Sequence, residues 1–85
     1  MKVEILMQHL MLFGEGHNGE VYDVKDGIRE IRYIPDVPFP LEAIVFTINH
    51  YRSVNGETYL IGYHGEEPLI ADIEEAILRF KPTPV

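Results

Sequence analysis

Apolar and polar residues alternate along much of this chain, on both sides of two similar phrases, Asn18–Tyr22 and Asn55–Tyr59. Alternation with a period of two is typical of half-buried β-strands. Each phrase begins with Asn-Gly, which suits the two central positions of a type I′ turn because both need positive φ. Each phrase therefore predicts the tip of a β-hairpin.

The first arm of the first hairpin, residues 3–13, is compatible with two structures. Leu6, Leu10 and Phe13 match one face of a helix that would end at Gly14, while the odd-numbered apolar residues alternate as a strand does. We expect a strand, because a hairpin at Asn18-Gly19 needs one strand leading in and one leading out. The helix remains the alternative.

A third strand is expected at 28–34, joined to 20–24 by the loop 25–27. A three-residue loop ending in glycine suits a type I turn followed by a bulge. That register would place Asp23 opposite Arg29 and would give Glu20 an arginine partner, Arg32. Prolines at 35, 38 and 40 then predict a stiff, extended connection. The P-x-x-P spacing could also be a ligand motif for an aromatic groove, but we favour the interpretation as a connection.

The strand expected at 42–54 folds back at Asn55-Gly56. A two-residue turn there would pair His50 with Ile61, and would group Val45, Tyr51 and Leu60 on the face opposite His50. Both faces would carry large apolar side chains, whereas a sheet with one face exposed to solvent needs them only on its buried face.

The clearest element is a C-terminal helix with Pro68 at its first position and Pro82 at its stop. Its expected buried face repeats at helical spacing: Leu69, Ile70, Ile73, Ala76, Ile77 and Phe80. We therefore expect an α+β fold, an antiparallel sheet of about five strands built from hairpins with one C-terminal helix packed on one face. Residues 1–82 would form a single small domain, and 83–85 a tail.

The composition excludes several classes of function. The chain of 85 residues has a formal net charge of −7 and no basic patch, which argues against nucleic acid and anionic membranes as partners. It has no cysteine, which excludes disulfides and thiolate metal sites and is compatible with a cytoplasmic protein. The apolar run 5–13 is too short to span a bilayer.

Three patterns in the sequence are candidates for a binding or catalytic site. Residues 14–19 match G-x-G-x-x-G, but a strand pattern follows where a dinucleotide site needs a helix. The four histidines are too widely spaced to predict a metal site, and no cofactor is expected. His50, with Tyr59 and Tyr63 nearby, is a possible ligand site or polar core site.

Binding without catalysis is the function that these features favour. We expect a small acidic protein-interaction or regulatory module that is not an enzyme and self-associates as a homodimer through a sheet face, with Val45, Tyr51 and Leu60 at the contact. One alternative is an acidic inhibitor, encoded by a mobile element, that occludes a basic surface of a host protein. A second is a small-molecule binder or minor enzyme that uses His50 and the nearby tyrosines.

Overall fold

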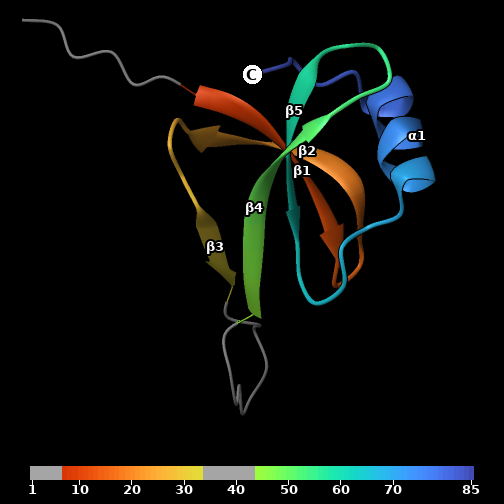
Figure 1. The fold of residues 1–85 in the computed structure, drawn as a ribbon. Helices are drawn as coiled ribbons and strands as arrows, with labels where there is room; N and C mark the ends of the chain where they lie inside the picture. Colours follow the sequence, from red (N-terminus) through yellow and green to blue (C-terminus); the bar gives the residue numbers. More distant parts are fainter. Residues whose placement is uncertain (1–6, 34–43) are drawn as a thin grey trace, which may run out of the picture.

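A computed structural model describes residues 7–33 and 44–85, which form a five-stranded sheet and one helix (Figure 1). The elements are β1 (Met7–Gly14), β2 (His17–Lys25), β3 (Glu30–Tyr33), β4 (Ile44–Arg52), β5 (Thr58–Tyr63) and α1 (Ile70–Phe80). The α+β class, the five strands, the C-terminal helix and the strand rather than helix over residues 7–13 are confirmed. The predicted strand residues 3–6 and the proline-rich connection lie outside the described residues.

The sheet is mixed, which corrects the expectation of a purely antiparallel one. Its strand order is β2-β1-β5-β4-β3, and β1 pairs with β5 in parallel while the other pairs are antiparallel. The direction of the chain reverses from each strand to the next, so the first and fifth strands run the same way. Bringing β5 beside β1 therefore produces a parallel pair.

β3 does not form a hairpin with β2, contrary to the sequence-based prediction. It pairs with β4, which sets Ile31 beside Phe46. The predicted partners are therefore separated: Asp23 lies 3.5 Å from His9 Nε2, and Arg32 Nε donates to Glu30 Oε1 at 3.2 Å. Burial of Ile31 against the apolar core outweighs the small gain from exposed charge pairs.

The sheet curls strongly, and its concave face is filled from within. Residues 26–29 connect β2 to β3, which are the two opposite edges of the sheet. His17 of β2 meets Phe46 of β4 edge-on at 5.8 Å between ring centroids, although in a flat sheet these strands would be about 14 Å apart. The concave core consists of Leu10, Leu12, Val24, Phe46 and Leu60.

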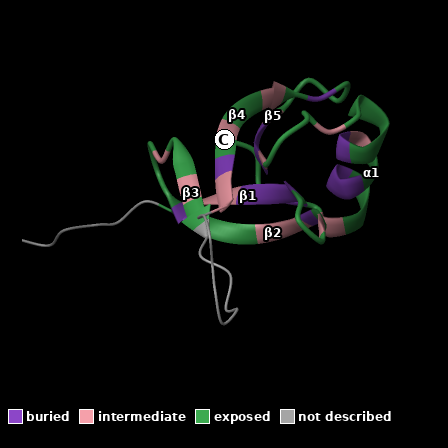
Figure 2. Cartoon of the chain, turned by 90° about the horizontal axis from the view of Figure 1, so that it is seen from below, coloured by how far each residue is buried: buried purple, intermediate pink, exposed green. Residues whose placement is uncertain are grey.

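The convex face is covered by α1. Its core consists of Met11, Phe13, Tyr59 and Ile61 from the sheet and Ile73, Ala76 and Ile77 from the helix. Figure 2 shows the buried side of α1 turned toward the sheet and its exposed side turned outward. Leu69 and Ile70 were expected on the buried face, but they are 70% and 66% exposed. They precede or begin the helix, where the chain is still approaching the sheet.

The first hairpin turns at Glu15-Gly16, and not at Asn18-Gly19 as predicted. Gly14 pairs with His17, and Glu15 and Gly16 both have positive φ, of 50° and 86°. Gly19 is instead the unpaired residue of a bulge in β2, where Asn18 pairs with Phe13 and Glu20 with Leu12, and it lies with φ 95° directly beneath the helix. A Cβ at Gly19 would lie 2.5 Å from Ala76 Cβ, so the missing side chain lets α1 approach the strand.

The second hairpin is where the sequence predicted it, with a loop that is one residue longer. Gly56 N–H donates to Ser53 O at 3.0 Å, and Ser53 N–H donates to Glu57 O at 2.8 Å. Gly56 has φ 91°, whereas Asn55 does not adopt a positive φ. This is a type I turn followed by a glycine bulge, and not a type I′ turn.

The last three residues return to the sheet. Thr83 N–H donates to His9 Nδ1 at 2.8 Å, and Val85 N–H donates to Thr58 O at 2.8 Å. These bonds attach the C-terminal segment to β1 and β5. Within the described ranges, no helix has the length and apolarity needed to cross a membrane.

Replacing Gly19 by alanine is expected to lower the free energy of unfolding by about 2–4 kcal/mol, because the new Cβ both strains a positive φ and collides with Ala76. Gly56→Ala is the matched control, since its φ is similarly positive but its surroundings are open. Urea unfolding of both variants measures the difference. Equal losses would show that close approach of α1 is not what requires Gly19.

Candidate interaction surface

The pairing of β4 with β5 decides which predicted site residues share a face. His50 lies opposite Leu60, and Tyr51 lies opposite Tyr59, so the observed register differs by one residue from the predicted one. The three-residue loop causes this difference, because it closes on Ser53 and Glu57 where a two-residue turn would close on Val54 and Glu57. A slip of one residue moves every side chain of β5 to the other face relative to β4.

The three predicted contact residues consequently do not form one surface. Leu60 is buried in the concave core and 4% exposed. Tyr51 packs against the convex core, on the helix side. Val45 is partly buried, and its carbonyl accepts a hydrogen bond from His64 Nδ1 at 2.9 Å. The premise of an apolar sheet face without cover is therefore not met in the described part of the chain.

The possible polar site of His50, Tyr59 and Tyr63 is likewise divided between the two faces. His50 is exposed and lines an open hollow with Gln8 and Arg29. Tyr59 is buried beneath α1, and its hydroxyl accepts a hydrogen bond from Asn55 Nδ2 at 3.0 Å. Tyr63 accepts from Asn49 Nδ2 at 2.9 Å. The structure does not bring these three residues together.

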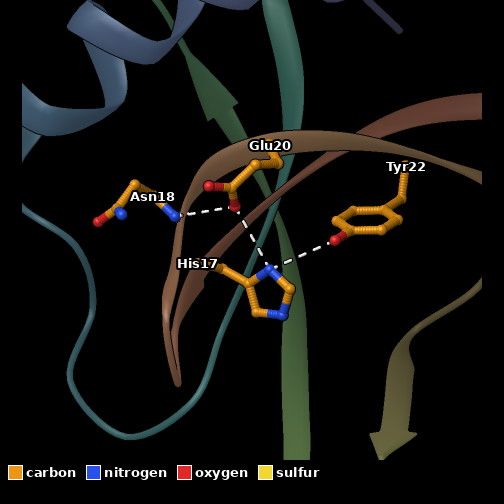
Figure 3. A network of polar contacts seen from close by, with 4 residues as sticks. All are labelled: His17, Asn18, Glu20 and Tyr22. Atoms are coloured by element: carbon orange, nitrogen blue, oxygen red, sulfur yellow. Dashed lines mark hydrogen bonds and ion pairs between the residues drawn. The ribbon is translucent and has the colours of Figure 1, made fainter.

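A polar cluster that the sequence did not indicate surrounds His17 (Figure 3). Glu20 Oε2 lies 3.3 Å from His17 Nδ1 and accepts the Asn18 N–H at 2.9 Å, and the Tyr22 hydroxyl lies 3.4 Å from the same Nδ1. Burial opposes ionisation of Glu20, but hydrogen bonds from the Asn18 and Glu20 backbones and from His17 outweigh it and lower its pKa. The H-x-x-E spacing at 17–20 was the available signal.

The geometry of this cluster suits packing better than acid–base catalysis. In a catalytic histidine the orienting carboxylate and the reacting group occupy different ring nitrogens. Here Glu20 and Tyr22 both contact Nδ1, and the imidazole edge meets the Phe46 ring. The cluster thus ties the bulge of β2 to the concave core. Across residues 7–33 and 44–85, no three His, Asp or Glu side chains are grouped to hold a metal ion.

The most unusual surface of the molecule is apolar and lies beside α1. We call it the helix–hairpin patch and define it as Val54, Leu69, Ile70 and Leu78, which are 86%, 70%, 66% and 77% exposed. Ile70 and Leu78 are one turn before and one turn after Glu74 on the same side of α1. The Ser53 hydroxyl, next to Val54 in the chain, donates to Glu74 Oε1 at 2.8 Å, which places the tip of the second hairpin beside the helix.

A partly buried set of hydrogen bonds, which we call the latch, joins the second hairpin to α1. The Tyr51 hydroxyl donates to Glu74 Oε2, and the Ser53 hydroxyl donates to Glu74 Oε1 at 2.8 Å. The Tyr51 hydrogen bond lowers the pKa of Glu74 against the opposing effect of burial, with Ser53 and the Val54 backbone adding to it. Burial, the hydrogen bond to Glu74 and its charge raise the pKa of Tyr51 to about 12.

The sequence contained a partial signal for this surface. Leu78 falls outside the helical arc of Ile73, Ala76 and Ile77, so its exposure was predictable. The position of Val54 beside the helix was not, because it depends on contacts between segments about twenty residues apart.

Replacing Tyr51 by phenylalanine should remove pH dependence in two ranges. Because the pKa of Glu74 is lowered in the folded state, its ionised form stabilises the fold above the ordinary pKa of 4.5, and this stabilisation is lost as the pH falls. Because the pKa of Tyr51 is raised, its protonated form stabilises the fold up to the ordinary pKa of 10, and this stabilisation is lost as the pH rises toward 12. Tyr51→Phe should cost about 1 kcal/mol at pH 7, where Glu74 is partly exposed. Urea unfolding from pH 3.5 to 11.5 should then show flatter profiles than the wild type.

Tyr22→Phe is the control for this prediction, because Tyr22 is exposed and makes no contact with Glu74. Parallel profiles for wild type and Tyr51→Phe at both extremes of pH would contradict the latch.

Models of protein families, curated proteins and solved structures were each compared with the chain, and none of the three comparisons gives a match.

Proposed function

We propose that this protein is a small acidic protein-interaction module without catalytic activity, which contacts a protein partner through the helix–hairpin patch. The observation that carries the proposal is the patch itself. Ile70 and Leu78 are exposed on one side of a short helix, and Leu69 at its N-cap and Val54 at the hairpin tip are exposed as well, each of the four to at least 66%. Clustered apolar surface of this kind marks interaction sites on small soluble domains.

The packing of the rest of the molecule supports placing the contact here. The chain's own side chains fill the concave face of the sheet, and α1 covers the core on the convex face. Val54, Leu69, Ile70 and Leu78 have no comparable cover among the described residues. A partner on the patch would remove from water the aliphatic surface that folding leaves exposed.

The latch supports the same proposal, because it orders the patch before a partner arrives. Tyr51 and Ser53 engage both carboxylate oxygens of Glu74, which lies at the centre of the patch. The helix and the hairpin tip are thereby held in one arrangement, so less conformational entropy is lost on binding. Because both carboxylate oxygens of Glu74 already accept a hydrogen bond within the chain, covering Glu74 by a partner removes fewer of its hydrogen bonds to water.

Site-specific photo-crosslinking in cells that make the protein tests the proposal. A photoreactive amino acid at position 78 is expected to give discrete protein adducts, because Leu78 lies in the patch. The matched control is position 47, since Thr47 is exposed on β4, away from the patch.

Adducts at position 78 that clearly exceed those at position 47 would support the proposal, because position 47 reports random collision. Equal yields at the two positions, or no adduct at position 78, would refute it.

A further inference from the structure

We infer that the occupant of the helix–hairpin patch is a second copy of this chain, with the two α1 helices packed antiparallel about a two-fold axis near Glu74. The inference rests on the proposed function and names its partner. It also moves the expected self-association from the sheet to the outer side of the helix.

The spacing of the patch along α1 is self-complementary. Ile70 and Leu78 lie four residues to either side of Glu74, on one side of the helix. A two-fold axis at Glu74 therefore brings Ile70 against the partner's Leu78, and Leu78 against the partner's Ile70. Exposed Ala71 lies on the same side and is small enough for two helices to approach each other.

Charges at the two ends of α1 favour the antiparallel arrangement. Glu66 and Glu67 precede the helix and Lys81 is its C-cap, and all three are exposed, whereas Asp72 and Arg79 lie on the far side of the helix from Glu74. An antiparallel pair about Glu74 places the segment before one helix near the segment after the other, so Glu67 comes near the partner's Lys81. Each acidic end therefore meets a basic end, and the two helix dipoles oppose each other favourably.

The carboxylate at the axis does not prevent this contact. Glu74 would approach the partner's Glu74, and two free carboxylates there would repel each other. Each is instead bound within its own chain by the hydroxyl groups of Tyr51 and Ser53. These bonds draw the carboxylate toward the hairpin and leave aliphatic surface along the axis.

The size of the patch predicts a reversible dimer. Contact through the patch alone would bury on the order of 1,000 Å² in total, which is at the low end of specific protein interfaces. The net charge of −7 on each chain adds a general repulsion. We therefore expect dissociation in the micromolar range of concentration, which sedimentation equilibrium resolves.

A charge-swap experiment on the full chain tests both the partner and the orientation. Glu67→Lys makes both ends of the helix basic, and Lys81→Glu makes both ends acidic, so each variant alone should dimerise at least about threefold more weakly than the wild type. An equimolar mixture restores the opposite charges at both ends. The mixture should associate more strongly than either variant alone.

Leu78→Glu tests the apolar contact and is expected to weaken dimerisation at least about tenfold. Met7→Glu is its control, because it makes the same chemical change at a 53% exposed position at the start of β1 and should leave dimerisation unchanged. Circular dichroism and urea unfolding confirm that each variant is folded before its association is measured.

Three results would overturn the inference: a wild type that is monomeric at every concentration, a dimer that Leu78→Glu does not weaken, or a mixture no stronger than the separate charge variants. The crosslinking experiment separates these failures from failure of the proposed function. A monomeric protein that still gives adducts with other proteins at position 78 retains the proposed function with a different partner. Absence of adducts at that position removes both.

Discussion

The fold depends on the burial of β1 on both of its faces. Four consecutive residues of β1, Leu10 to Phe13, are at most 6% exposed, with the even-numbered pair in the concave core and the odd-numbered pair beneath α1. A strand that is apolar on both faces must lie inside its sheet, with neighbours on both edges. β2 and β5 supply those neighbours, and the parallel pairing with β5 follows from this position.

Each of the two cores covers one face of β1. On one side the sheet curls until His17 and Phe46 meet, which closes the concave core without another element. On the other side α1 lies so close to β2 that no side chain fits at Gly19. A helix of 11 residues can bury only one side in this way, and Leu78 with its neighbours remains outside. The proposed interaction surface is thus a consequence of how β1 is covered.

The length of the loop between β4 and β5 decides which residues of these two strands share a face, and so which residues can form a surface. One additional residue in the loop after β4 shifts the register with β5, so Leu60 enters the concave core while Tyr51 turns toward the helix. The same change lets Ser53 bind Glu74 beside Tyr51. Leu60 and Tyr51, which were expected at a sheet contact, therefore belong to the concave core and to the latch. The exposed aliphatic side chains of the helix–hairpin patch lie near the latch.

Apart from residues 7–13, which matched a helix as well as a strand, the local patterns in the sequence were sufficient for the strands and the helix, because period-two alternation and helical spacing reflect the geometry of each segment alone. They identified the buried residues Ile73, Ala76 and Ile77, and the position of the second hairpin. They could not determine that β3 joins β4, that Asn18-Gly19 lies within a strand, or that Tyr51 and Ser53 bind Glu74 of the helix. Those outcomes depend on contacts between distant segments, where burial of apolar surface decides among turns and pairings of nearly equal local energy.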